Sequence, residues 1–350
     1  MKILENIPIA KLTTMRLGGK ARYVIEAQSL DDIESAFDFA KERSLPVWIM
    51  GGGANTIGRD EGFDGVIILN RLRGICINDL DHSAKLPNEV TFTAMAGENW
   101  DDLVQAACEL GYSGIEAMSM IPGTVGAAPV QNIGAYGQDI SKVIEHVEAY
   151  DTQTGDLVKI TKPEMQMGYR HTRFNYGSDA GRFVILSVTI RLCKGCLQPP
   201  FYNSLQRYVE NIHETNFSPE NIRRMICEIR KEKLPDPAEI ASAGSFFKNV
   251  YVDQAEADAA EARGIPVWRD ADGKGKINSG WLIEACGLKG AELDGFRVSD
   301  KAALVLINEK ATSYAQLEKA RAKIIEAVKN KSGYVLQQEP VEIPTGAKMI

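Results

Sequence analysis

Two glycine-rich loops have the bare backbone that suits an anionic or amide-bearing ligand. Residues 120–137 read MIPGTVGAAPVQNIGAYG, with four glycines and no charged side chain. Glycine lets another group approach the main chain closely, and unhindered N–H groups can hold an anion. Gln131 and Asn132 add two amides to this apolar run, and a second loop, Gly51–Gly53, lies upstream. A tight crossover of small residues explains either loop alone, but their combination favours a binding site.

The upstream loop does not match the two common phosphate-binding fingerprints. Residues 51–56 read GGGANT, so Thr56 stands where the dinucleotide fingerprint G-x-G-x-x-G needs its third glycine. No Gly-Lys-Ser/Thr follows, as a P-loop requires. By itself this loop is explained nearly as well by a tight turn after the strand as by a phosphate-binding site.

Four further segments concentrate side chains that can bind or transfer charge. Arg170 lies in GYRHTRF, and its planar fork suits a carboxylate. Ser245 lies in GSFFKN, and Lys233 precedes Pro-Asp-Pro. Glu339 lies in the tail segment QQEPVE. Each segment alone has an ordinary structural explanation, namely a surface pair, a helix cap, a turn or a solvated tail.

Composition restricts the class of protein. The 350 residues suffice for two or three domains, and 44% apolar with 25% charged residues is typical of a globular protein. The net charge of −7 and the absence of a basic run argue against a nucleic-acid partner. No apolar run is long enough to span a bilayer, and MKILENIP lacks the apolar core of a signal peptide. We therefore expect a cytoplasmic protein without a membrane partner.

The cysteines and histidines predict no metal site. Of six cysteines, only Cys193 and Cys196 form a C-x-x-C pair, and a zinc site needs a second pair. Two reduced thiols in a cytosolic protein are the simpler interpretation. The four histidines show no metal-ligand spacing.

The pattern of apolar residues predicts an α+β protein built from three units. Residues 21–70 read as β-α-β, with strands at 23–25, 46–50 and 65–69 and a helix opened by Ser29 with Asp32 as capping-box partner. Residues 71–192 predict strands at 90–96 and 183–192, a helix at 101–110, and a hairpin of 147–150 with 157–160.

A third unit follows a change in composition. Residues 193–217 read as a linker, and Ser218-Pro219 then starts a helix, with serine as N-cap and proline at the first position. Further helices are predicted near 253–263, 281–286 and 312–331, with a strand at 303–307.

In combination, these motifs resemble one enzyme family, the UDP-N-acetylenolpyruvoylglucosamine reductases. The resemblance covers nearly the whole chain, from about 13 to 341. Tyr202, which precedes Lys233 across the long linker, is similar to the subtype with a mobile tyrosine loop over the substrate. The matching motifs are GGGAN at 51–55, AGENW at 96–100, IPG through QNIGAYG at 121–137, and GSFFKN at 244–249.

The resemblance implies an α+β fold with a two-lobed FAD-binding domain of the p-cresol methylhydroxylase type and a separate α+β substrate-binding domain. The first lobe is expected at 1–70 and the second at 71–200. The substrate domain is expected at 201–333, and the segment 334–350 is expected to return to the flavin domain.

The resemblance also implies FAD, NADPH as hydride donor, a nucleotide-sugar substrate and a monomeric enzyme whose site holds no metal. Because residues 45–59 hold no His or Cys, we expect the FAD to be bound non-covalently. The implied catalytic residues are Arg170, Ser245 and Glu339; the implied substrate-binding residues are Tyr169, Tyr202, Lys233, Asn249 and Lys289; and the implied cofactor-binding residues are Gly51, Gly52, Gly53, Ala54, Asn55, Thr56, Ile121, Pro122, Gly123, Gly126, Ala127, Gln131, Asn132, Gly134, Ala135 and Tyr136.

Chemistry accounts for the three implied catalytic residues. Hydride addition to an enol ether that bears a carboxylate leaves an enolate-like intermediate. A cation and a hydrogen-bonding acid beside the carboxylate lower that barrier, which suits Arg170 and Glu339. The adjacent carbon then needs a proton, which a neutral Ser245 can give if it lies within hydrogen-bond reach.

Two departures from the family pattern leave alternatives open. Pro340 separates Glu339 from Val341 where the family has Glu-Val, so Glu342 is the alternative acid. Ala302 replaces a polar side chain, and Lys301 is the alternative contact to the diphosphate. Two other functions remain as hypotheses, a flavoprotein oxidase of the same superfamily and a non-catalytic module that binds flavin or a nucleotide sugar.

Overall fold

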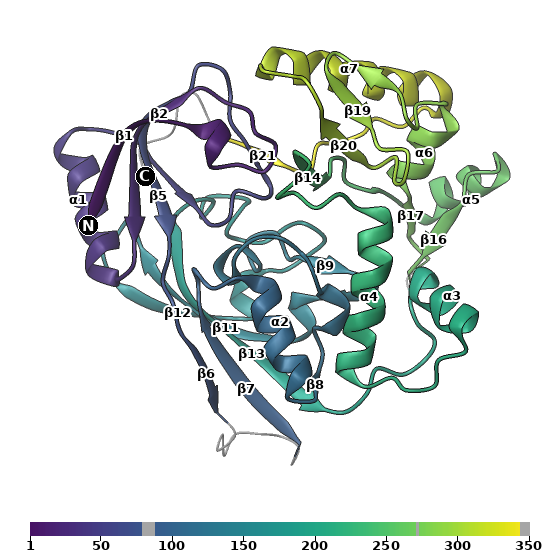
Figure 1. The fold of residues 1–350 in the computed structure, drawn as a ribbon, viewed down its shortest axis with the longest axis horizontal. Coiled ribbons are helices and arrows are strands. Elements are labelled where there is room, and N and C mark those ends of the chain that lie inside the picture. Colours follow the sequence, from purple (N-terminus) through teal and green to yellow (C-terminus); the bar gives the residue numbers. More distant parts are fainter. Residues whose placement is uncertain (79–87, 271–272, 344–350) are drawn as a thin grey trace.

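The computed structural model describes residues 1–78, 88–270 and 273–343, and its first unit is a four-stranded sheet (Figure 1). The strand order is β1-β2-β5-β3, with β1 antiparallel to β2 and the other pairs parallel. Helix α1 begins after the predicted cap, since Ser29 accepts a hydrogen bond from the Asp32 N–H. These elements are β1 Lys2–Pro8, β2 Lys20–Ala27, α1 Leu30–Glu42, β3 Val47–Met50 and β5 Phe63–Asn70.

The second unit is a larger antiparallel sheet with strand order β12-β11-β13-β7-β6, and β8 also pairs with β13. Leu103 and Val104 of helix α2 are buried in the same core as Phe92 and Ile190 of the sheet. Val184 and Leu186 of β13 instead join the core of the first unit, so the side chains of this strand contribute to the cores of both units. The elements are β6 Ile75–Asn78, β7 Glu89–Met95, α2 Trp100–Glu109, β8 Tyr112–Ser113, β11 Ile144–Asp151, β12 Leu157–Thr161 and β13 Phe183–Lys194.

The predicted linker 193–217 is partly wrong, because it contains helix α3, Asn203–Ile212. Leu205 and Val209, one helical turn apart, are buried against helix α4, Pro219–Lys233. The start of α4 is confirmed, with Ser218 as N-cap and Pro219 at the first position. In Figure 1, α4 stands between the sheet that carries α2 and the third unit.

The third unit combines a four-stranded sheet, β14-β20-β19-β18, with a three-stranded sheet, β15-β17-β16. Helix α7 begins at a complete capping box of Ser313 and Gln316 and ends at Gly333, whose φ is 83°. The predicted helices and strand of this unit are confirmed. The elements are β14 Ser242–Ser245, β15 Val250–Val252, α5 Gln254–Ala262, β16 Val267–Arg269, β17 Gly275–Ile277, α6 Ser279–Ala285, β18 Glu292–Leu293, β19 Phe296–Val298, β20 Val305–Asn308 and α7 Tyr314–Ser332.

After α7 the chain crosses back to the first unit. Strand β21, Val341–Glu342, pairs in parallel with β4, Thr56–Ile57, directly after the upstream glycine loop. Residues 344–350, the end of the segment expected to return to the flavin domain, lie outside the described residues. None of the helices in the described part is long and apolar enough to cross a bilayer.

Candidate active site

A cavity of about 1170 Å³ lies where the three units meet. Pockets for one small ligand span about 300–1,000 Å³, so this volume suits a dinucleotide with a second ligand beside it. Its wall comes from the glycine loop after β3, the 120–137 loop, the segment before β13, the 248–251 segment and the tail at 335–341. The chain thus collects five distant segments around one space.

The two glycine loops interlock, and this explains their composition. A Cβ on Gly51 would lie 2.3 Å from the Thr124 hydroxyl, and one on Gly52 would lie 3.0 Å from the Gly123 Cα. Gly53 has a φ of 65°, and its Cβ would lie 2.0 Å from the Leu12 carbonyl oxygen. A side chain on Gly51 or Gly52 would force the loops apart, and one on Gly53 would clash with Leu12, so the glycines allow the close packing that forms this cradle.

Most of the predicted cofactor residues line the cavity. The Asn55 amide donates a hydrogen bond to the Gln131 side chain, which joins the two loops across the space. The segment 96–100 supports them from behind, since the Ala96 carbonyl accepts from the Gly126 N–H at 2.9 Å. The lining residues among those predicted are Gly51, Gly52, Gly53, Ala54, Asn55, Thr56, Ile121, Pro122, Gly123, Gly126, Ala127 and Gln131.

Four predicted cofactor residues do not line the cavity. Gly134 and Ala135 form the two-residue strand β9, Gly134–Ala135, in a hairpin with β10, Gln138–Asp139. Tyr136 lies at the turn of that hairpin, and its ring packs on Tyr202 at 5.9 Å between centroids. Asn132 is buried and its amide donates to the Gly168 carbonyl at 3.0 Å.

Arg170 and Glu339 form the charged centre of the cavity wall. The Arg170 Nε lies 2.7 Å from Glu339 Oε1 at the distance of an ion pair, without the alignment of an N–H···O hydrogen bond. The guanidinium also donates to the Asn132 carbonyl at 3.1 Å, and Arg170 has a φ of 53°. Asn132 thus positions Arg170, and its cofactor contact stays a prediction.

Burial raises the pKa of the Glu339 carboxyl above its usual value, even though the positive charges of Arg170 and Lys248 act in the opposite direction. The side chain is 11% exposed. A carboxyl with a raised pKa holds its proton more readily than a solvated one, so Glu339 can act as a hydrogen-bonding acid.

Tyr169 and Asn249 connect the segment before β13 to the third unit. The Asn249 N–H donates to the Tyr169 hydroxyl at 3.3 Å, and the Asn249 side chain accepts from the Ser279 N–H at 3.2 Å. The Tyr169 ring packs on Tyr251 with 4.5 Å between centroids. Tyr169 and Asn249, two of the five predicted substrate residues, line the cavity.

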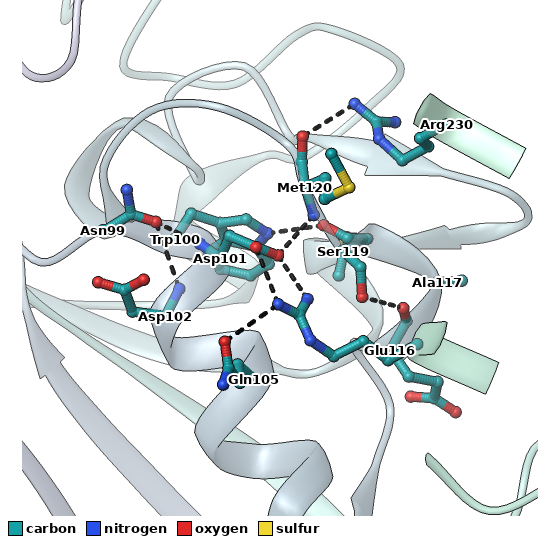
Figure 2. A network of polar contacts seen from close by, with 12 residues as sticks. Asn99, Trp100, Asp101, Asp102, Gln105, Glu116, Ala117, Ser119, Met120 and Arg230 are labelled. Atoms are coloured by element: carbon teal, nitrogen blue, oxygen red, sulfur yellow. Dashed lines mark hydrogen bonds and ion pairs between the residues drawn. The ribbon is translucent and has the colours of Figure 1, made fainter. Parts of the chain in front are cut away.

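Figure 2 shows the polar network that supports the 120–137 loop. Asp101 accepts from the Met120 N–H at 2.5 Å and forms an ion pair with Arg223 at 2.5 Å. Arg230 donates to the Met120 carbonyl at 3.1 Å (Figure 2). Burial opposes ionisation of Asp101, but the bonds from Arg223 and Met120 lower the pKa of the carboxyl overall. The network therefore ties α4, which ends at Lys233, to the start of the loop.

The remaining predicted site residues lie away from the cavity lining. Ser245, at the end of β14, is partly buried and pairs with Val305. Tyr202 precedes α3, and Lys233 ends α4. Lys289 forms an ion pair with Glu284 at 3.0 Å. The structure thus assembles Arg170, Glu339, Tyr169 and Asn249, and leaves Ser245, Tyr202, Lys233 and Lys289 outside the lining.

Sequence reasoning missed several residues that line the cavity. Lys248 lies within the GSFFKN motif and Tyr251 lies shortly after it, so their nearness to Asn249 was the available signal. His171 and Tyr176, with 4.4 Å between ring centroids, also line it, but no spacing in the sequence marked them. Among the described residues, no group of three or more His, Cys, Asp or Glu can hold a metal ion.

Comparison with known proteins identifies the family. The family model described as FAD binding domain matches residues 21–161, and the one described as UDP-N-acetylenolpyruvoylglucosamine reductase, C-terminal domain, matches residues 236–343. The UDP-N-acetylenolpyruvoylglucosamine reductase of Ralstonia nicotianae is 37% identical over 98% of this chain and 100% of its own length. The chain belongs to this family. The reductase of Pseudomonas putida is 36% identical over 96% of this chain and 97% of its own length.

The family assignment confirms both the resemblance and the α+β fold with an FAD-binding domain and a separate C-terminal domain. The crystal structure of the Thermus caldophilus reductase (MurB) aligns with a TM-score of 0.65 over 98% of this chain and 100% of its own. At 21% identity this similarity concerns the fold alone.

Proposed function

We propose that this chain reduces UDP-N-acetylenolpyruvoylglucosamine to UDP-N-acetylmuramate, with FAD as cofactor and NADPH as hydride donor, in the synthesis of peptidoglycan precursors. The observation that carries the proposal is the family membership over nearly the full length, together with a cavity whose wall holds the Arg170–Glu339 pair. The substrate is therefore a nucleotide sugar with an enolpyruvyl carboxylate.

The glycine cradle fits FAD. Two glycine loops without charged side chains line the cavity and suit a diphosphate, and the apolar walls beyond suit flat rings. FAD, when bound, accepts hydride from NADPH and supplies it to the substrate. Because residues 45–59 contain no His or Cys, we propose that it is held without a covalent bond.

Arg170 and Glu339 are proposed to hold the enolpyruvyl carboxylate and to stabilise the charge that develops on it. The guanidinium is fixed by Asn132, so it needs no reorganisation when the charge appears. The buried Glu339 carboxyl retains its proton more readily than a solvated one and can donate a hydrogen bond to the same oxygens.

Ser245 is proposed as the proton donor to the substrate carbon. Its position supports this role indirectly, since the carbonyl of the next residue, Phe246, accepts a hydrogen bond from the Glu339 N–H at 2.9 Å. Gly244 precedes it with a φ of 68°, and a Cβ placed there would meet nothing within 4 Å beyond its chain neighbours. We propose that the hydroxyl reaches the substrate carbon once the ligands are bound.

The substrate diphosphate is proposed to contact Tyr202, Lys233 and Asn249, and Tyr169 and Lys289 are proposed as further substrate-binding residues. Tyr169 and Asn249 already lie at the cavity, whereas Tyr202, Lys233 and Lys289 lie before α3, at the end of α4 and in the segment after α6. We propose flavin lobes at 1–70 and 71–200, joined by the returning tail, and a substrate domain at 201–333. We further propose a monomer in the cytoplasm, where nucleotide sugars and NADPH are found.

The test is turnover by the purified protein. UDP-N-acetylenolpyruvoylglucosamine and NADPH should give UDP-N-acetylmuramate, identified by mass, and acid should release intact FAD into the supernatant. Consumption of NADPH that depends on oxygen and not on the sugar nucleotide would instead identify an oxidase.

A further inference from the structure

The tail strand that carries Glu339 is held on both sides of that residue. On one side, the Lys248 N–H donates to the Gln337 carbonyl at 2.8 Å, and the Glu339 N–H donates to the Phe246 carbonyl. On the other side, the Val341 N–H donates to the Asn55 carbonyl at 2.9 Å. The segment 337–343, which we call the strap, therefore joins the third unit to the glycine loop with Glu339 between the two attachments.

The strap has a gap in its backbone bonding next to Glu339. Pro340 has no N–H and cannot donate to either neighbour. The Gln338 side chain compensates, since its amide donates to the Pro340 carbonyl at 2.8 Å and so closes the turn around Glu339. Its oxygen in turn accepts from Arg321 at 2.7 Å.

Glu342 is the centre of the contacts that hold this turn. Its Oε2 lies 2.6 Å from an Arg59 nitrogen, and its Oε1 lies 2.7 Å from an Arg321 nitrogen. Oε1 also accepts from the Tyr314 hydroxyl at 2.7 Å and from the Gln338 amide at 3.2 Å. Arg59 follows β4, whereas Tyr314 and Arg321 lie on α7, so one carboxylate joins both units to the strap.

We propose that Glu342 is a positioning residue, which fixes the strap so that Glu339 stays against Arg170. The inference rests on the proposed function, because only there does the Glu339 carboxyl act on a substrate. Glu342 itself does not line the cavity, and the four donors occupy both of its oxygens. It is thus unsuited to the acid role that the sequence left open for it.

The test compares Glu342→Gln with Glu256→Gln. Glu256 forms a smaller Arg–Glu–Tyr cluster in the third unit, with Arg263 at 2.7 Å and Tyr334 at 2.5 Å; Tyr334 precedes the strap in the chain, but none of the three residues belongs to it. Each substitution removes one carboxylate charge from an Arg–Glu–Tyr cluster. Hydrogen–deuterium exchange of peptides over 337–343, and stopped-flow rates of flavin reduction and reoxidation, are measured on the purified flavoprotein for both.

Glu342→Gln should speed exchange in the strap and slow reoxidation by the sugar nucleotide about ten- to a hundredfold, since small misplacements of catalytic groups cost rates of this order. Flavin reduction by NADPH should change less than about twofold, because the misplaced strap acts on the second half-reaction. Glu256→Gln should leave the strap and both rates unchanged. Faster exchange with unchanged reoxidation, or equal slowing by both variants, would overturn the positioning role. Failure of the wild-type protein to be reoxidised by the sugar nucleotide would instead refute the proposed function and leave the exchange comparison valid.

Discussion

Asn132 and Arg170 illustrate how a residue predicted for one contact can have a second role that only the structure reveals. The sequence marked Asn132 as a polar residue in an apolar loop, and predicted a cofactor contact. In the structure its carbonyl holds the Arg170 guanidinium and its amide holds the Gly168 carbonyl. Because Arg170 adopts a φ of 53°, its direction depends on such neighbours and not on local propensity.

Substitution of Ser245 by alanine should separate the two half-reactions. Flavin reduction by NADPH needs no proton donor for substrate carbon and should stay near the wild-type rate. Reoxidation by the sugar nucleotide should slow by roughly 10²–10⁴-fold, the usual contribution of a positioned general acid. Stopped-flow absorbance measures both, and equal slowing of the two halves, or of neither, would leave Ser245 with a structural role alone.

Substitution of Glu339 by glutamine should lower turnover by roughly 10²–10³-fold, the range found when one group that stabilises developing charge is removed. Glutamine keeps the size but loses the acid proton and leaves Arg170 without its 2.7 Å partner. Steady-state kinetics measure the change. Glu309→Gln removes an equally short ion pair with Arg297 at the surface and should be near wild type; a similar loss in both would argue against a role for Glu339.

At the scale of helices and strands, local signals predicted most of the fold. Ser29 and Ser218, the two predicted caps, each begin a helix, because a side-chain oxygen accepts from a backbone N–H that has no partner within the helix. Helix α3 was missed, since its two buried residues, Leu205 and Val209, stabilise it only against α4. A short helix of this kind depends on tertiary packing. The Gly and Pro residues of this segment predicted a linker and gave no sign of that packing.

Helix α4 is predicted to depend on Asp101 for its place beside the 120–137 loop. Asp101→Asn should raise KM for the sugar nucleotide several-fold with a smaller change in kcat, because Lys233 at the end of α4 would lose its position. Stability should fall by about 1–3 kcal/mol, the contribution of a charged hydrogen bond. Asp102→Asn is the control, since Asp102 is exposed and points away from these contacts in Figure 2. Equal effects on KM in both variants would contradict the role of the network.

At the scale of the whole molecule, the cavity was beyond sequence reasoning because its walls come from segments far apart in the chain. The tail strand β21 pairs with β4 across nearly the whole sequence, and Glu342 bonds Arg59 and Arg321 at once. The motifs predicted which residues belong to the site. They could not predict that Ser245 and Lys233 lie outside the cavity lining, because that depends on the packing of the three units.

The Glu342 cluster predicts a specific dependence of stability on pH. Burial opposes ionisation of Glu342, but the bonds from Tyr314, Arg59 and Arg321 outweigh it and lower the pKa of the carboxyl to about 2. Because the pKa of Glu342 is lower in the folded state, its ionised carboxylate stabilises the fold at pH values above the unfolded pKa of about 4.3. This contribution is lost as pH falls towards about 2. Denaturant unfolding should show Glu342→Gln less stable by about 1–3 kcal/mol at pH 7, with the difference shrinking below about pH 4.5. A difference that stays constant down to about pH 3 would contradict this account.

The central claim is that hydride is transferred from NADPH to FAD, and from FAD to an enolpyruvyl sugar nucleotide, within one cavity. The most direct measurement is the flavin absorbance of the purified protein without oxygen, first after NADPH and then after UDP-N-acetylenolpyruvoylglucosamine. The account predicts that NADPH bleaches the flavin band and that the sugar nucleotide restores it, with one UDP-N-acetylmuramate formed per flavin reoxidised. A bleached flavin that only oxygen restores would contradict it.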